Sequence, residues 1–350
     1  MNNASVTTVL AATTLCALAP TVVCAHHSSS LFLFNKLVTV EGTIVKVAWQ
    51  NPHVYLTIES RGPDGKPVQQ DIQGASLSMI KTFGLTREKL APGTHVKVDA
   101  AAQKSGADHL LWGGFITFDD GSVYLLETAG PNTHIPSVPA ATSLAGKWVP
   151  PPTTIRAFLQ TLQSLPLTEQ AAAGRAVLSD PRGPASFCDD ATPSVAAAML
   201  GALPVLHTIE IGASTVVLRI DADGMNIERV VHLDQPTHAA GLAPSAVGHS
   251  TGRWEGGTLA IDTVGFAATP ISSDALHLVE RLTLAVDKRH LSYEATLDDA
   301  KLWTKPVTLS ATWDYRPDVE PSGAACDREN ARRYLQDTVL PDAPGAAPRQ

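Results

Sequence analysis

The chain has 350 residues, a formal net charge of −8 and no cluster of Lys and Arg. A nucleic-acid partner would require a basic surface and is therefore not expected. Pro and Gly number 25 each, and this abundance among many Val and Thr favours short strands and turns over long helices. The expected fold class is mainly β.

Residues 1–25 are expected to be a signal peptide. They contain no Asp, Glu, Lys or Arg, and the apolar stretch from Val6 to Val23 is too short and too rich in Ala and Thr to stay in a bilayer. Small residues precede a cut after Ala25, so His26 would begin the mature chain; the alternative is a nearby cut. No later apolar segment could serve as a membrane anchor, which predicts a periplasmic or secreted protein.

The predicted mature chain keeps two cysteines, Cys188 and Cys326. An even pair in an oxidising compartment favours a disulfide over two free thiols. Such a bond would tie the C-terminal part of the chain to the second domain. No Cys-x-x-Cys motif is present, so a redox role is not expected.

Residues 26–130 are expected to form a small barrel. Strand-like runs separated by turns are followed by a short helix-like segment, Ser76–Phe83, and then by further runs. The runs are Val38–Trp49, Val54–Ser60, Val68–Gly74, Thr94–Ala100, Gly113–Phe118 and Ser122–Leu126. Three strands, a helix and then more strands is the order of an OB-type barrel, with another small β-barrel as the alternative.

Residues 131–145 are rich in Pro, Ser, Thr and Ala and are expected to be a linker to a second domain at residues 146–336. A helix is predicted at Leu167–Leu178 because Thr168-Glu169-Gln170 opens an Ala-rich segment. Seven strand-like runs follow at regular spacing: Val205–Ile211, Thr215–Ile220, Ile227–Leu233, Thr258–Val264, Leu276–Val286, His290–Leu297 and Val307–Tyr315.

Short turns between these runs predict an antiparallel meander, which closes into a barrel or stacks as a sandwich. Gly146-Lys147-Trp148 is similar to the Gly-x-Trp opening of lipocalins. We therefore expect a lipocalin-like antiparallel barrel. Residues 337–350, rich in Pro and Ala, are expected to form a loose tail.

Two motifs resemble uncharacterised families of exported bacterial proteins. Ala25-His26-His27-Ser28 and Trp49-Gln50-Asn51-Pro52-His53 resemble a family with a His-His-Ser mature end and a Trp-x-Asn-Pro-His motif. Gly248-His249-Ser250-Thr251-Gly252-Arg253-Trp254-Glu255-Gly256-Gly257-Thr258-Leu259 resembles an uncharacterised β-barrel domain. The resemblance covers most of the mature chain and implies no reaction.

The new N-terminus suggests a metal site. His26 would offer both its α-amine and its ring, and His53 could add a second imidazole. Amine and imidazole nitrogens suit copper, which an exported protein meets directly. The alternative is that the N-terminal histidines make no contacts and that His53 only caps a turn.

A second polar set lies in the larger domain, where a His beside a carboxylate would move protons at neutral pH. The expected catalytic residues are His249, Arg253, Glu255, His277 and Glu280. Either histidine would be the general base, either glutamate the acid or orienting partner, and the arginine would stabilise negative charge. The expected ligand-binding residues are Trp254, Asp262 and Lys305.

The placement of this set leaves alternatives open. His249 and Trp254 are expected on a Gly-rich loop, where binding residues often lie. His277 and Glu280 are three apart, so in an extended strand they would point to opposite faces. Alternatively, the charged residues only hold the loop down and Trp254 fills the core.

Ser250 lies at the centre of a Gly-x-Ser-x-Gly frame, but its flanks indicate loop and strand, so a serine hydrolase is not favoured. The expected function is cofactor-free acid/base chemistry, by a lyase, an isomerase or, less favoured, a hydrolase, on a small, largely apolar molecule in the second barrel. The first alternative is a non-catalytic binding protein for a lipid-like ligand or copper. The second is an envelope adhesion or assembly module.

Overall fold

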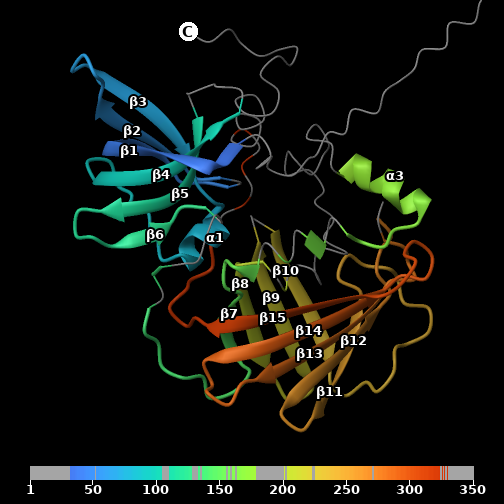
Figure 1. Cartoon of the computed structure of the whole chain (residues 1–350). Helices are drawn as coiled ribbons and strands as arrows, with labels where there is room; N and C mark the ends of the chain where they lie inside the picture. Colours follow the sequence, from blue (N-terminus) through green and yellow to red (C-terminus); the bar gives the residue numbers. More distant parts are fainter. Residues whose placement is uncertain are drawn as a thin grey trace, which may run out of the picture.

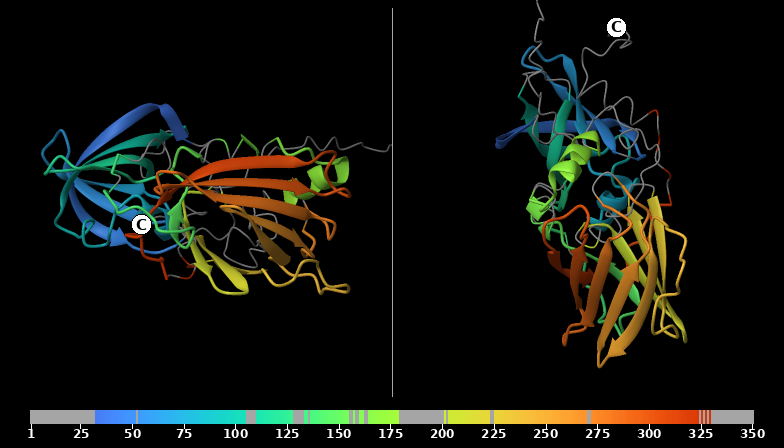
Figure 2. Two further views of the ribbon diagram at one scale, coloured as in Figure 1. Left: turned by 90° about the horizontal axis from the view of Figure 1, so that it is seen from below. Right: turned by 90° about the vertical axis from the view of Figure 1, so that its right-hand side faces the viewer.

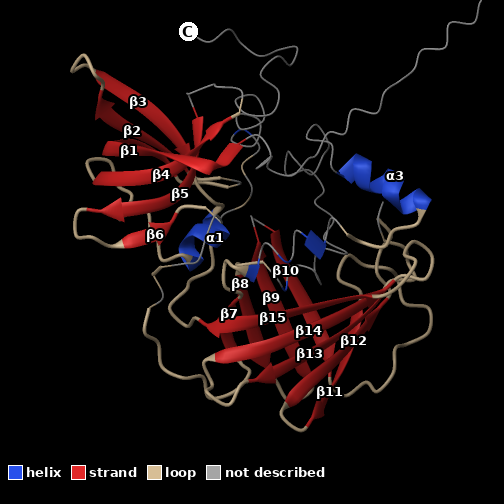
Figure 3. Ribbon diagram, viewed as in Figure 1, coloured by secondary structure: helices blue, strands red, loops and turns tan. Residues whose placement is uncertain are grey.

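The computed structural model describes residues 32–329 apart from 52, 105–109, 128–132, 135, 155–156, 158–159, 162–163, 179–200, 202, 223–224, 270–271, 324, 326 and 328. Two β-structures follow one another along the chain, and Figure 1 shows the first one above and to the left of the second. Strands dominate both of them (Figure 3). Among the described residues, no helix is long and apolar enough to cross a membrane.

The first domain contains six strands and one helix. They are β1 (Phe32–Ala48), β2 (Tyr55–Arg61), β3 (Pro67–Gln73), α1 (Leu77–Thr82), β4 (His95–Gln103), β5 (Leu110–Phe118) and β6 (Val123–Leu125). The sheet order is β3-β2-β1-β4-β5-β6, and β3 also pairs with β5 in parallel. Strands β1 to β5 therefore close into a ring, and this is the connectivity predicted for an OB-type barrel.

Helix α1 connects β3 to β4, as the sequence predicts. It begins after Ser76, whose side chain accepts a hydrogen bond from the backbone of Met79, and such an N-cap satisfies one of the free amide groups of the first turn. Ile80 and Leu77 are buried in the core of the domain together with residues from the surrounding strands.

The second domain is a closed barrel of nine strands, β10-β11-β12-β13-β14-β15-β7-β8-β9. The strands are β7 (Gly146–Val149), β8 (Leu206–Ile211), β9 (Thr215–Ala222), β10 (Met225–His232), β11 (His249–Glu255), β12 (Thr258–Val264), β13 (His277–Leu284), β14 (His290–Asp298) and β15 (Val307–Tyr315); helix α3 (Glu169–Leu178) lies between β7 and β8 in sequence. Side chains alternate between the core and solvent, most regularly along β14.

One pair of neighbouring strands in this barrel differs from the others because the number of strands is odd. Nine strands in a ring cannot all run opposite to their neighbours, and the parallel pair is β10 and β11, where Val231 lies beside Ser250. Parallel neighbours need a connection that returns along the barrel. The segment 233–248 makes this return and, as shown below, brings a histidine to the outer wall.

The two domains are in contact at one end of the second barrel (Figure 2). Thr82 at the end of α1 donates to the carbonyl of Pro204 at 3.0 Å, and Arg316 donates to the carbonyl of Thr82 at 2.8 Å. Met79 on α1 packs in one cluster with Val205 and Ile227 of the barrel. The first domain therefore covers part of the barrel end.

The structure confirms a mainly β protein with barrels, but it corrects three details. His249–Glu255 is strand β11 rather than a Gly-rich loop, because Gly248 at φ 67° turns the chain directly into register with β12. The short strand β7 was not expected as a strand, although Gly146-Lys147-Trp148 was noted. The barrel is also not wholly antiparallel, because β10 and β11 pair in parallel.

Candidate functional site

The predicted catalytic residues lie on two sides of the barrel wall. On β13 the residues alternate, so Glu280 is buried with 2 % of its surface exposed, whereas His277 faces solvent. The prediction that these two side chains point to opposite faces is thus confirmed. His249, Arg253 and Glu255 lie on the outer wall with His277, and Glu280 faces the interior.

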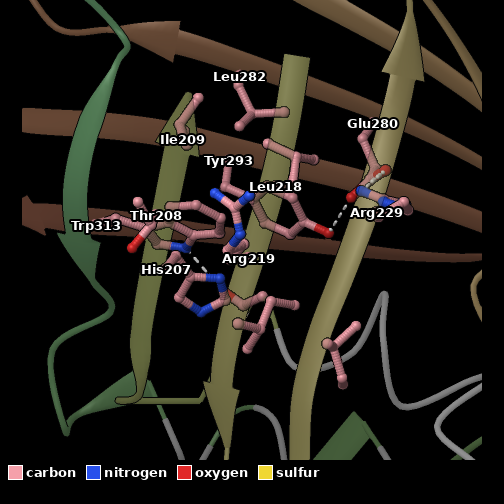
Figure 4. Close-up of a pocket in the computed structure, with 13 residues that line it drawn as sticks. His207, Thr208, Ile209, Leu218, Arg219, Arg229, Glu280, Leu282, Tyr293 and Trp313 are labelled. Carbon is pink, nitrogen blue, oxygen red and sulfur yellow. Dashed lines mark hydrogen bonds and ion pairs between the residues drawn. The ribbon is translucent and has the colours of Figure 1, made fainter. Parts of the chain in front are cut away.

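Inside the barrel, Glu280 forms a polar cluster with two residues from other strands. Arg229 on β10 places Nη2 2.6 Å from Oε2 of Glu280, and the hydroxyl of Tyr293 on β14 donates to Oε1 at 2.9 Å. Figure 4 shows Arg229 and Glu280 pointing toward one another and Tyr293 reaching Glu280. Burial and the negative charge of Glu280 raise the pKa of Tyr293 well above its usual value, so its phenol stays protonated.

The contact between Arg229 and Glu280 leaves hydrogen-bonding capacity unused. The 2.6 Å approach is an ion pair, and among the residues that the structure describes neither Oε2 of Glu280 nor Nη1 of Arg229 has a hydrogen-bond partner. Both atoms are buried. A buried donor and a buried acceptor without regular partners are costly, so their position beside a cavity points to a role in binding.

Aromatic rings form the neighbouring wall of this cavity. The ring of Trp313 on β15 stacks on Tyr293 with 4.8 Å between centroids and on His207 of β8 with 4.2 Å. The indole nitrogen donates to the carbonyl of Gly201 at 2.7 Å, which fixes the ring. The volume of the cavity is about 20 Å³, which is enough for about one or two water molecules.

A chain of hydrogen bonds joins three histidines on the outer wall. Asp262 of β12 accepts from Nε2 of His238 at 2.8 Å and from Nε2 of His277 at 2.9 Å. Nδ1 of His238 lies 2.9 Å from Nδ1 of His249, and the ring of His232 stacks on His249 at 5.2 Å. The segment 233–248, which the parallel pairing of β10 and β11 requires, supplies His238. We call His232, His238, His249, His277 and Asp262 the outer histidine cluster.

The carboxylate fixes the protons of the outer histidine cluster. Because Asp262 only accepts, Nε2 of neutral His238 must donate, and its Nδ1 then accepts from Nδ1–H of His249. Nε2 of His249 is left as a base. Burial, and then the positive charges that His238 and His232 carry whenever they are protonated, lower the pKa of His249. Burial works to raise the pKa of Asp262, but the hydrogen bonds from His238 and His277 lower it overall.

The outer histidine cluster does not have the geometry of a metal site. Within the described part of the chain, no group of three His, Cys, Asp or Glu side chains is arranged to hold a metal ion. One ring nitrogen of His238 faces His249 and the other faces Asp262, so these side chains satisfy one another instead of converging on a common point.

The remaining predicted residues of the larger domain are on the surface. Glu255 forms ion pairs with Arg253 at 2.6 Å and Arg281 at 2.7 Å, at the opposite end of β11 from His249. Trp254 is 44 % exposed and does not fill the core. Lys305 is exposed in the turn between β14 and β15. The structure therefore does not bring Glu255, Arg253 or Lys305 to the cavity.

The proposed metal ligands of the first domain are only partly described. His53 is buried, and its Nδ1 lies 3.0 Å from the carbonyl of Gly74, so that nitrogen donates. Burial lowers the pKa of His53 to about 4, although the hydrogen bond to Gly74 acts in the opposite direction. His26, Cys188 and Cys326 lie outside the described residues, so the copper site and the disulfide remain predictions.

Sequence reasoning missed several residues of the two clusters: Arg229, Tyr293, Trp313, His207, His238 and His232. A signal for Arg229 was present, because it alternates with Ile227 and Val231 on the buried face of β10. A charged residue on the apolar face of a strand is seldom without a role. No local signal identifies His238, since only the course of the returning segment places it.

One family match covers most of the first domain. Residues 14–112 match a family of unknown function (DUF6152). The match ends within β5 and does not include the second barrel. A search of curated proteins gives no match. The first domain is therefore similar to an uncharacterised protein family, and this similarity assigns no reaction to the chain.

Proposed function

We propose that the second barrel catalyses cofactor-free proton transfer on a small, largely apolar molecule, as a lyase or isomerase does. The observation that carries this proposal is the convergence of Glu280, Tyr293 and Arg229 on one buried cavity. A carboxylate, a protonated phenol and a fixed cation are the groups that acid/base catalysis uses. Much of the remaining lining is aliphatic: Ile209, Leu218, Ile220, Ile227 and Leu282. Arg219 also borders the cavity, but its guanidinium is 42 % exposed and pairs with Glu210 and Glu228.

Each polar group has a defined part in the proposed reaction. Glu280 removes a proton from carbon with its Oε2; the C–H electron pair forms a new double bond, and the displaced π electrons go to an electron-withdrawing oxygen of the substrate. Tyr293 holds Oε1 through its 2.9 Å hydrogen bond and so orients the carboxylate. Return of the proton to another carbon gives isomerisation, and loss of a leaving group gives elimination.

The two domains would share this task. Ile220 and Ile227 line the cavity, and both belong to the cluster that contains Met79 of α1. The first domain would thus help to exclude water from the reaction, which strengthens electrostatic interactions in the site.

We also propose that the protein works outside the cytoplasm, because the apolar residues 1–25 have the composition of a signal peptide.

Nitroethane tests the proton-transfer proposal without knowledge of the natural substrate, because it is small, neutral and acidic at carbon. Formation of its nitronate can be followed by ultraviolet absorbance. We expect Glu280→Gln to lower kcat/KM by about 10²-fold or more, and Tyr293→Phe to lower it less, since the carboxylate remains. Glu294→Gln, which changes an exposed glutamate next to Tyr293 on the same strand, should leave the rate unchanged.

Circular dichroism and thermal unfolding must show that these variants are folded. Equal rates for the wild type and a folded Glu280→Gln variant would overturn the catalytic proposal and favour the alternative, a non-catalytic binding protein.

Export is tested by mass spectrometry of the protein from its native host. We expect a chain that begins at His26 and has Cys188 linked to Cys326. Retention of Met1, or two thiols that alkylate without reduction, would contradict export and the disulfide respectively.

A further inference from the structure

The charge of the interior cluster restricts what the cavity can hold. Arg229 and Glu280 are both more than nine-tenths buried, and at 2.6 Å their opposite charges form a neutral pair. A third charge would have to leave water without a counter-ion in the cavity, and such a transfer is strongly unfavourable. The pair therefore selects against anionic and cationic ligands alike.

The unused atoms of the pair specify which neutral group fits. Nη1 of Arg229 offers N–H groups that have no partner among the described residues, and Oε2 of Glu280 offers an acceptor beside it. An oxygen that accepts from Nη1 would satisfy the buried donor. A carbonyl oxygen does so without bringing a charge, and the weakly acidic C–H beside a carbonyl would then lie next to Oε2.

The rest of the lining is suited to the body of such a molecule. Leu218, Leu282 and Ile227 are aliphatic, and Trp313 presents an aromatic ring. The cavity volume of about 20 Å³ is small. Side chains must therefore move before a ligand larger than about one or two water molecules can bind. A ligand with a few carbon atoms beyond the carbonyl is therefore favoured over a long lipid chain.

We infer that the ligand of the second barrel is a small, neutral carbonyl compound whose oxygen accepts a hydrogen bond from Nη1 of Arg229 while its α-carbon faces Glu280. The inference rests on the proposed function in placing the reaction in this cavity. It adds the class of substrate and gives Arg229 a catalytic role. When Glu280 takes the α-proton, the C–H pair becomes a C=C bond, and the carbonyl π electrons become an enolate oxygen beside the guanidinium.

Three five-membered rings that differ in one substituent test the inference. They are cyclopentanone, cyclopentanecarboxylate and cyclopentylammonium, with dissociation constants measured by saturation-transfer NMR at pH 7. We expect the Kd of the wild type for cyclopentanone to be at least about 10-fold lower than its Kd for either ion. Glu294→Gln is the matched control and should keep this preference.

The variants make the charge argument specific. Glu280→Gln leaves Arg229 without its counter-charge, so the preference should change to cyclopentanecarboxylate. The double variant Arg229→Met with Glu280→Gln restores neutrality without the guanidinium and should lose the preference for the ketone as well as that for the carboxylate. Thermal unfolding of each variant confirms that the barrel is intact, and the double variant is the safeguard if a single variant fails to fold.

Equal binding of the three rings by the wild type, or no change of preference in both folded variants, would overturn the inference. These measurements are made at equilibrium and involve no proton transfer. Selective binding with normal nitronate formation by Glu280→Gln would therefore contradict only the catalytic proposal, whereas rapid proton transfer without the ketone preference would contradict only the assignment of the substrate class.

Discussion

Replacing Arg229 with methionine is expected to lower the free energy of unfolding by about 3–5 kcal/mol, because it leaves the carboxylate of Glu280 buried without its counter-charge. Glu280 is 2 % exposed and cannot regain water without opening the barrel wall. The hydrogen bond from Tyr293 remains but carries no full positive charge. Urea unfolding at pH 7 gives the value directly.

A double replacement separates the ion pair from simple packing. Arg229→Met combined with Glu280→Met removes both charges and fills the space with apolar side chains, which for buried pairs is often neutral or stabilising. We therefore expect the double variant to be more stable than Arg229→Met alone. If instead the losses from the two single variants add up in the double variant, the charges do not interact and the interior cluster is not a pair.

Acid is expected to destabilise the first domain through His53. Its pKa falls from 6.5 to about 4 on folding, mainly because it is buried. Between these two values the unfolded chain binds a proton that the folded chain does not, so stability is fully present above pH 6.5 and is lost as the pH falls toward 4. The shift corresponds to about 3 kcal/mol at pH 4.

His53→Gln is the matching variant for this effect. Glutamine can still donate to the carbonyl of Gly74 but does not titrate, so urea unfolding of this variant should lose the part of the pH dependence that His53 contributes. The carboxylate of Glu127 lies 4.0 Å from Nδ1 of His53. The same fall in stability between pH 6.5 and 4 in the wild type and His53→Gln would show that another group is responsible.

Much of the fold could be predicted because its signals are local. The turn Gly62-Pro63-Asp64-Gly65 and the cap at Ser76 mark the ends of elements in the first domain, and the resulting order matches the ring of β1 to β5. The alternation of apolar and polar residues in the sequence of β14 likewise predicts a strand with one buried face. Strand β11 was missed because Gly248, Gly252 and the charged pair Arg253 and Glu255 are typical of a loop, whereas pairing with β12 stabilises His249–Glu255 as a strand.

The site was less predictable because its members come from distant strands. Glu280 was identified for its charge, but its partners Arg229 and Tyr293 lie on β10 and β14. Only closure of the barrel brings these three strands around one cavity. His249 and His277 were chosen as bases for the same cavity, yet the alternation of their strands points both outward, where Asp262 and His238 satisfy them.

The central claim is that a neutral carbonyl compound lies between Arg229 and Glu280 inside the second barrel, and a crystal structure of the protein soaked with cyclopentanone tests it most directly. We predict density for the ring in the cavity, with its oxygen about 3 Å from Nη1 of Arg229 and its α-carbon facing Oε2 of Glu280. A ring that binds only at the outer histidine cluster, or a cavity that holds only water at saturating ketone, would contradict the claim.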